Sequence, residues 1–129
     1  MIINYNPFLS RIFTIFILLL SLLCFGCSQI IEVVDISNDQ VEITAPSNNS
    51  TLTITNVNFS WESIHDAEQY KLQIATPSFE EANQVVLDTT IIATGFIQGL
   101  STGDYQWRVR AENSDYQTVF TTQSFSIEE

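Results

Sequence analysis

Cysteine, histidine and positive charge are scarce in this 129-residue chain, and each scarcity excludes a class of protein. Both cysteines, Cys24 and Cys27, lie near the N-terminus, so the rest of the chain can form no disulfide of its own. The single histidine, His65, has no other histidine near it in the sequence with which to share a zinc ion. Neither a glycine-rich phosphate loop nor a nucleophile elbow is present. We therefore expect a protein that is not an enzyme, with no catalytic residues, no metal site and no cofactor.

Positive charge is almost absent after residue 27. Only Lys71, Arg108 and Arg110 lie beyond that point, together with all 15 Asp and Glu residues, which leaves a side-chain charge of −12. Such a polyanion repels phosphate backbones and anionic lipid headgroups, which argues against nucleic acid as a partner and against membrane docking through a basic patch. A solvated surface that favours solubility explains this charge, and a cation site or a basic partner is the alternative.

Long apolar runs are confined to the N-terminus. Residues 12–25 are almost wholly apolar and follow Arg11, the only cation of the leader. This run suits the core of a signal peptide and is too short to cross a bilayer comfortably as a helix.

The run ends in Gly26-Cys27-Ser28, which resembles the lipobox of bacterial lipoproteins. The resemblance implies a signal peptide over residues 1–26 and a lipid on the Cys27 thiol, which anchors the chain to a membrane. Serine rather than aspartate after the cysteine resembles the default route to the outer membrane, with surface display as a further expectation. Cys24 and Phe25 depart from the aliphatic and small residues that are commoner in a lipobox. The alternatives are an uncleaved anchor helix and an ordinary secretory signal with coincidental cysteines.

Residues 27–40 form the expected lipidated cysteine and tether. The stretch 30–36 is too apolar and too β-branched for a simple flexible linker. It predicts either an extra edge strand or a segment that lies against the folded domain.

From residue 41 onward, short β-rich runs alternate with turn signals, and no helical period is evident. Alternating large apolar residues predict buried faces on several of these runs, for example Val57, Phe59 and Trp61. The clearest run places Tyr105, Trp107, Val109 and Ala111 on one face and polar residues on the other. The seven predicted strands are residues 41–46, 57–61, 70–76, 85–88, 90–97, 105–111 and 119–127.

Several of these residues together resemble a fibronectin type III domain over residues 41–129. They are Trp61 on the second strand, Tyr70 on the third, and Leu100, Gly103 and Tyr105 at the entry to the sixth. The resemblance implies an all-β fold, a seven-stranded immunoglobulin-like sandwich, in which Tyr105 forms a tyrosine corner. The absence of a cysteine pair excludes the disulfide-bearing antibody type, and the absence of Arg-Gly-Asp after the sixth strand removes the adhesive activity of some members.

Candidate binding residues lie in the loops and at one pole. Tyr116 and Phe120 could stack on sugar rings or anchor a protein, and packing beneath the loop is the alternative. Phe79 is expected to fold back into the core. The acidic Glu80 and Glu81 are expected at the pole that faces away from the tether, because the resemblance implies that the loops after the second and sixth strands lie at the tethered pole. Residues 35–39 carry side-chain oxygens that could bind calcium. They lack the glycine and the terminal glutamate of known calcium loops, so we expect no calcium site there.

These observations predict a lipid-anchored, non-enzymatic protein-interaction or spacer module of the bacterial envelope, at the outer membrane. The alternative is a small carbohydrate-binding accessory of a glycan uptake or degradation system.

Overall fold

The computed structural model describes residues 6–21, 26, 30–81 and 83–129, and the chain divides into two compact units. The first unit, Met1–Glu32, contains helix α1 (Pro7–Ser21), which begins at a proline, as helices often do. Within the described residues, no helix combines the length and apolar character needed to cross a membrane. Cys27, the predicted lipidation site, lies outside the described residues.

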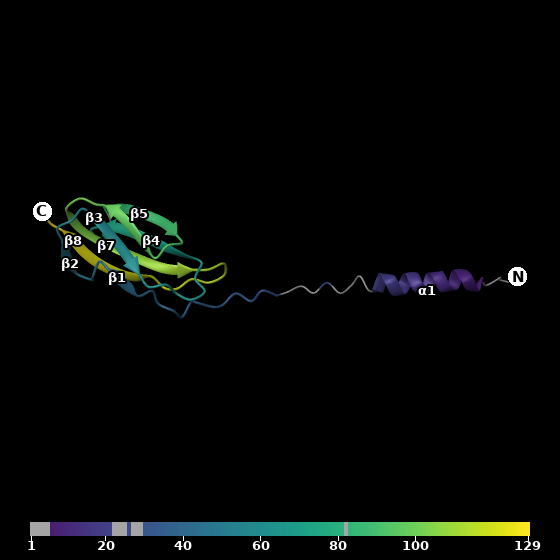
Figure 1. The fold of residues 1–129 in the computed structure, drawn as a ribbon. Coiled ribbons are helices and arrows are strands. Elements are labelled where there is room, and N and C mark those ends of the chain that lie inside the picture. Colours follow the sequence, from purple (N-terminus) through teal and green to yellow (C-terminus); the bar gives the residue numbers. More distant parts are fainter. Residues whose placement is uncertain (1–5, 22–25, 27–29, 82) are drawn as a thin grey trace. The chain divides into compact units, whose positions relative to one another are not determined.

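The second unit, Val33–Glu129, is a sandwich of two β-sheets (Figure 1). One sheet has three strands in the order β1-β3-β6, and the other has five in the order β2-β8-β7-β4-β5. This confirms the predicted all-β sandwich, and β2 is an addition to the seven expected strands. The strands are β1 (Ile43–Ala45), β2 (Ser50–Leu52), β3 (Asn56–Trp61), β4 (Gln69–Thr76), β5 (Gln84–Ile91), β6 (Gly95–Gly99), β7 (Gly103–Glu112) and β8 (Thr121–Ile127).

The core lies between the two sheets and follows the two-residue period of the strands. Phe59 of β3 meets Trp107 of β7 edge to face, with ring centroids 4.8 Å apart, so the most buried aromatic residues of the two sheets are in direct contact. The buried apolar side chains are Ile36, Val41, Val57, Phe59, Trp61, Tyr70, Leu72, Ile74, Ala75, Leu100, Tyr105, Trp107, Val109, Ala111, Phe125 and Ile127.

Tyr105 forms the expected corner. Its ring is buried and stacks on Phe125 with centroids 5.4 Å apart, and its hydroxyl donates a hydrogen bond of 2.9 Å to the backbone oxygen of Ser101. The phenol therefore holds the turn before β7 from the core side.

The predicted strands 85–88 and 90–97 are wrong in their bounds. Residues 90–97 do not form a single strand, because β5 continues to Ile91 and β6 begins at Gly95 in the other sheet. Because β6 belongs to the other sheet, its alternation of side chains is independent of that of β5, and its neighbouring residues Phe96 and Ile97 point to opposite faces. Phe96 packs against the core, whereas Ile97 is 67% exposed.

The segment before β1 packs against the sandwich. Ile36 is only 1% exposed and belongs to the same core cluster as the strands. Residues 30–42 contain no strand. Of the two predicted alternatives for this stretch, the structure shows a segment lying against the domain, because the buried Ile36 side chain fills space in the core that a free linker would leave empty.

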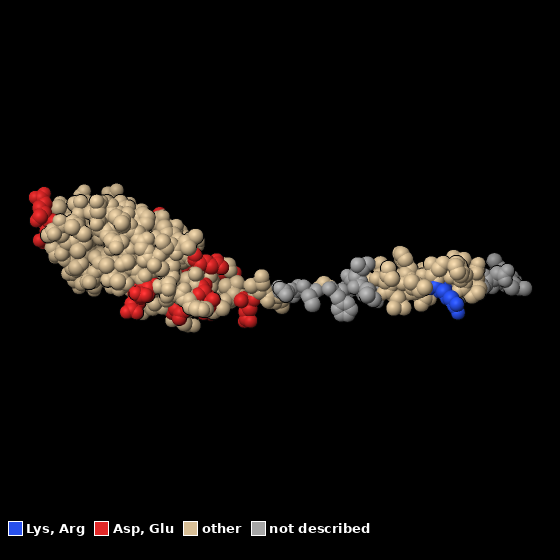
Figure 2. All heavy atoms as spheres, viewed as in Figure 1, with Lys and Arg blue, Asp and Glu red and all other residues tan. Residues whose placement is uncertain are grey.

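Hydrogen bonds between loops show which loops lie together at each end, or pole, of the sandwich. The Asn113 side chain donates to the backbone oxygens of Val34 at 2.9 Å and Asp66 at 3.3 Å, so the loops after β3 and β7 lie at the pole where the chain enters the domain. At the other pole Thr76 donates to the Asp104 backbone oxygen at 2.7 Å. This agrees with the predicted arrangement. On the face that Figure 2 shows, acidic side chains gather toward both poles, with a largely uncharged surface between them.

Candidate interaction surface

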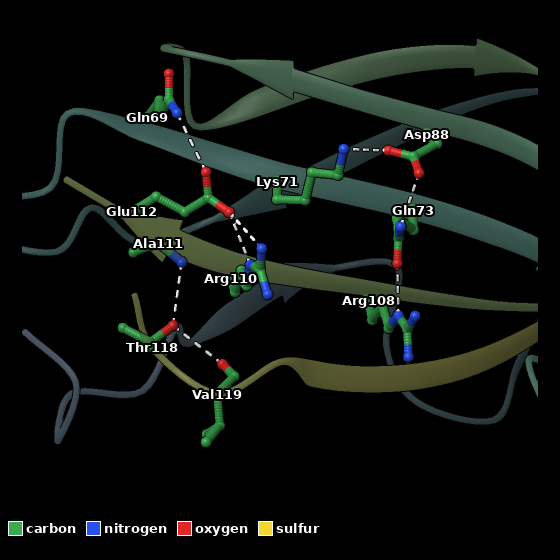
Figure 3. A network of polar contacts seen from close by, with 10 residues as sticks. All are labelled: Gln69, Lys71, Gln73, Asp88, Arg108, Arg110, Ala111, Glu112, Thr118 and Val119. Carbon is green, nitrogen blue, oxygen red and sulfur yellow. Dashed lines mark hydrogen bonds and ion pairs between the residues drawn. The ribbon is translucent and has the colours of Figure 1, made fainter. Parts of the chain in front are cut away.

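All three cations of the sandwich lie on the outer face of the five-stranded sheet (Figure 3). The two-residue period places them there, because their neighbours on β4 and β7 point into the core. Lys71 forms an ion pair with Asp88 of the neighbouring β5. Gln73 donates to the same carboxylate at 2.9 Å and accepts a bond of 2.7 Å from the Nε of Arg108. A continuous polar chain therefore crosses β5, β4 and β7.

The Asp88 carboxylate is stabilised in its charged form by these neighbours. The hydrogen bond from Lys71, and after it the one from Gln73, hold its pKa below the ordinary value of 3.8. Because Asp88 is exposed, water screens this pair, and its contribution to stability is small.

A second polar cluster lies toward the tethered pole. Arg110 contacts Glu112 through Nε at 2.8 Å and Nη2 at 2.7 Å, and Gln69 donates to the other oxygen of that carboxylate at 3.1 Å. Beside it, the Thr118 hydroxyl accepts from the Ala111 backbone at 3.1 Å and donates to Val119 at 3.0 Å. The segment between β7 and β8 is thus fixed to the end of the sheet.

Two phenyl rings complete this face. The Arg108 guanidinium carbon lies 4.1 Å from the ring centroid of Phe79 and 4.4 Å from that of Phe120, and the Arg110 guanidinium carbon lies 4.7 Å from Phe120. Each such contact contributes about 0.5–2 kcal/mol, depending on its desolvation. We call the row Phe79, Arg108, Phe120 and Arg110 the cation–π row.

The cation–π row changes two predictions for aromatic residues. Phe79 does not fold back into the core. Its ring lies against the Arg108 guanidinium on the outer face, and its backbone N–H donates a hydrogen bond of 3.0 Å to the Gln106 side chain. Phe120, predicted as a binding residue, is half-buried between two guanidiniums. The spacing of Arg108 and Arg110 on one strand face was the available sequence signal, but their aromatic partners come from distant loops.

Tyr116, the other predicted aromatic, lies at the tethered pole with 37% of its surface exposed. Its loop is closed by the Asn113 side chain, which accepts bonds from the backbone of Asp115 at 3.2 Å and Tyr116 at 2.8 Å. Tyr116 lines an open hollow of about 370 Å³ together with Arg110 and Glu112. An aromatic side chain thus lies beside charged hydrogen-bonding groups.

Glu80 and Glu81 are exposed on the loop between β4 and β5, at the pole away from the tether. The Glu81 backbone donates to the Ser78 hydroxyl at 3.1 Å, which orders the turn. Tyr116 and Phe120 lie between β7 and β8, and Phe120 shares the Arg108 guanidinium with Phe79, the residue before Glu80.

The histidine and the acidic residues form no metal centre among the residues that the structure describes. The His65 side chain is 93% exposed, and its Nδ1 contacts the adjacent Asp66. In the acidic stretch 35–39, Asp35 accepts a bond of 2.8 Å from the Ser37 backbone N–H.

The sandwich is similar to known fibronectin type III-like modules. It superposes on a fibronectin(III)-like module of CbhA from Clostridium thermocellum with a TM-score of 0.51, at 11% identity over 69% of this chain and 96% of that one. The crystal structure of FN3tt gives a TM-score of 0.50, at 14% identity over 70% of this chain and 90% of that one. No protein-family model matches the sequence, and no curated protein matches it. These likenesses establish the fold.

Proposed function

We propose that this chain is a bacterial lipoprotein, anchored through a lipid on Cys27, whose sandwich acts as a non-enzymatic protein-interaction or spacer module of the cell envelope, at the outer membrane. The apolar run that ends in Gly26-Cys27 supports the anchor. The fibronectin type III-like fold supports the module, since domains of this kind are generally not catalytic.

The cation–π row is the observation that carries an interaction role. Arginine and aromatic residues dominate the energetics of protein interfaces, and this row gathers four of them on one sheet face. Arg108 is stacked between two rings and bonded to Gln73, so little side-chain freedom remains for a partner to remove.

Purification of partners from envelopes tests this role. Arg108→Ala should reduce recovery of a partner, because it removes the centre of the row, whereas the matched outer-face variant Thr122→Ala should not, since Thr122 is exposed and takes no part in the row. Equal recovery with both variants would contradict a role for this face.

Metabolic labelling with a fatty-acid probe tests the anchor separately. The wild-type chain should be labelled and Cys27→Ser should not, with Cys24→Ser as the matched control. Labelling lost only with Cys24→Ser would move the lipid to that residue, and equal labelling of all three chains would argue against lipidation.

The acidic pole gives a second way for a protein to dock. We propose that a basic partner surface or a bridging divalent cation meets Glu80 and Glu81, with an association that weakens as salt screens the charges. A solvated acidic cap that deters aggregation is the alternative. Partner recovery by Glu80→Lys/Glu81→Lys at low and high salt distinguishes them, because an inert pole leaves recovery unchanged at both.

The Tyr116 hollow favours the second candidate function, a carbohydrate-binding accessory of a glycan uptake or degradation system. An exposed aromatic ring can stack on a sugar, and the neighbouring Arg110 and Glu112 offer hydrogen bonds to its hydroxyls. Binding on a glycan array that is lost with Tyr116→Ala and retained with Phe120→Ala would support it.

A further inference from the structure

Arg108 is the one cation of the sandwich without a carboxylate partner among residues 33–81 and 83–129. Lys71 and Arg110 each form an ion pair with an acidic side chain, whereas the Arg108 Nε donates to the neutral amide oxygen of Gln73. In Figure 3 this hydrogen bond is the only dashed line that reaches Arg108. Three cations and two carboxylates are drawn there, so one positive charge, that of Arg108, is left over.

The two terminal nitrogens of Arg108 are open to solvent. Gln73 occupies Nε, so a ligand can reach only Nη1 and Nη2. Neither is among the side-chain atoms that are buried without a hydrogen-bond partner, which are Ser50 Oγ, Trp61 Nε1, Trp107 Nε1 and Gln123 Oε1. Since neither nitrogen has a partner in the described part of the chain, both are exposed to water.

We propose that Arg108 binds a carboxylate group of a partner protein through Nη1 and Nη2. This inference rests on the proposed interaction role of the cation–π row and names the chemistry that the row recognises. A guanidinium presents parallel N–H groups that match the two oxygens of a carboxylate, and such bidentate pairs are stronger and more directional than single hydrogen bonds. Because Nε is occupied, the pair forms at the end of the guanidinium.

The two phenyl rings strengthen this pair. The Arg108 guanidinium carbon lies 4.1 Å from the ring centroid of Phe79 and 4.4 Å from that of Phe120, so apolar surface flanks the charge. Rings in this position displace water, and opposite charges attract more strongly where water is displaced. The rings and Gln73 also fix the orientation of the guanidinium, so its binding to a carboxylate costs little side-chain entropy.

The charge of the whole domain limits the ligand to a single carboxylate. The side-chain charge of −12 after residue 27 repels anions, and the repulsion grows with each further charge on the ligand. A phosphate group carries about 1.5–2 negative charges at neutral pH and would meet only one unpaired cation. We therefore expect the partner to present one carboxylate on a surface that is otherwise neutral or basic.

Nuclear magnetic resonance of the arginine side chains tests the site directly. The detergent-solubilised full chain is titrated with sodium acetate, and separately with sodium chloride and sodium phosphate at the same ionic strength. Acetate should shift the Arg108 N–H signals along a saturating curve, chloride should not, and phosphate should bind more weakly than acetate. The Arg110 signals are the control within the same spectrum, because Arg110 is already paired with Glu112 and should shift little.

Two variants test the geometry of the pair, with binding followed through the backbone amides of β7. Arg108→Lys keeps the charge but replaces the planar guanidinium with an ammonium group, so acetate should bind about tenfold more weakly, as expected for the loss of one charge-assisted hydrogen bond. Thr122→Ala shortens the residue opposite Arg108 in the ladder and should leave acetate binding unchanged. Equal shifts with acetate and chloride, tighter binding of phosphate, or undiminished acetate binding in Arg108→Lys would each overturn the proposal.

Competition for a captured partner separates this inference from the proposed function. Sodium acetate should displace the partner at a lower concentration than sodium chloride does at the same ionic strength. Full recovery of the partner by Arg108→Ala would contradict the interaction role of the row and, with it, this inference. Recovery that is lost in Arg108→Ala, but displaced equally by both salts, would contradict the carboxylate alone and leave the interaction role intact.

Discussion

Removing the hydroxyl of Tyr105 separates the two ways in which this residue stabilises the sandwich. In Tyr105→Phe the ring still stacks on Phe125, but the 2.9 Å hydrogen bond to the Ser101 oxygen is lost. Ser101 is exposed, so water can replace the missing donor, and the loss should be the net value of one hydrogen bond, about 1 kcal/mol.

Tyr105→Ala removes the ring as well. The side chain is only 7% exposed and belongs to the core cluster, so its truncation leaves a cavity between β7 and β8. A loss of about 3–5 kcal/mol is expected, which is a large part of the about 5–15 kcal/mol that stabilises a typical domain.

Urea unfolding followed by tryptophan fluorescence measures both losses, because Trp61 and Trp107 are buried in the same core. Tyr116→Phe is the matched control, since it removes a hydroxyl from a tyrosine that is 37% exposed and should leave the midpoint unchanged. The reasoning would be refuted if Tyr105→Phe were as stable as the wild type, or if Tyr105→Ala were no less stable than Tyr105→Phe.

Three further predictions follow from the packing and the outer face. Ile36→Ala should lower the free energy of unfolding by about 2–5 kcal/mol because its side chain is buried, whereas Ile30→Ala, at an 89% exposed position, should have no effect in the same urea titration. The pKa of Asp88 is lowered in the folded chain, so its small contribution to the free energy of unfolding is present above the pKa of the unfolded carboxyl and is lost as pH falls through the folded pKa. Asp88→Asn should remove that part of the pH dependence of the free energy of unfolding, and an unchanged dependence would contradict this. Arg108→Lys should retain the charge but weaken the stacking on Phe79 and Phe120, so faster hydrogen exchange of the backbone around Phe79 is expected, and exchange equal to wild type would argue against the row.

The strands that the sequence predicts best are those with one buried face. In β3, and in β7 from Tyr105 onward, every second residue is apolar, so the period alone identifies the face that meets the other sheet. The same reasoning fails for β2, whose three residues are fixed by parallel pairing with β8, a partner more than seventy positions away. It also fails for Ile36, because a single apolar residue in a linker has no periodicity that shows whether it packs into the core.

The outer face was harder to predict than the core. Arg108 and Arg110 share a strand face, but Phe79 and Phe120 reach them from separate loops, and a loop has no periodicity from which its direction can be read. Tyr105, by contrast, was recognisable from the pattern of Leu100, Gly103 and Tyr105, and its partner Ser101 lies within that same short stretch.

The placement of β8 has a mechanical consequence. Val34 is held at one pole by Asn113, while β8 runs from Thr121 toward Ile127 at the other pole, paired on one side with β7 and on the other with β2. A pulling force between Val34 and Ile127 would act along β8 and therefore across its ladder hydrogen bonds, which lie roughly perpendicular to the strand. These bonds would have to break together under shear, not one at a time as in the peeling of an end strand. The domain can thus transmit tension along its length without losing its last strand first.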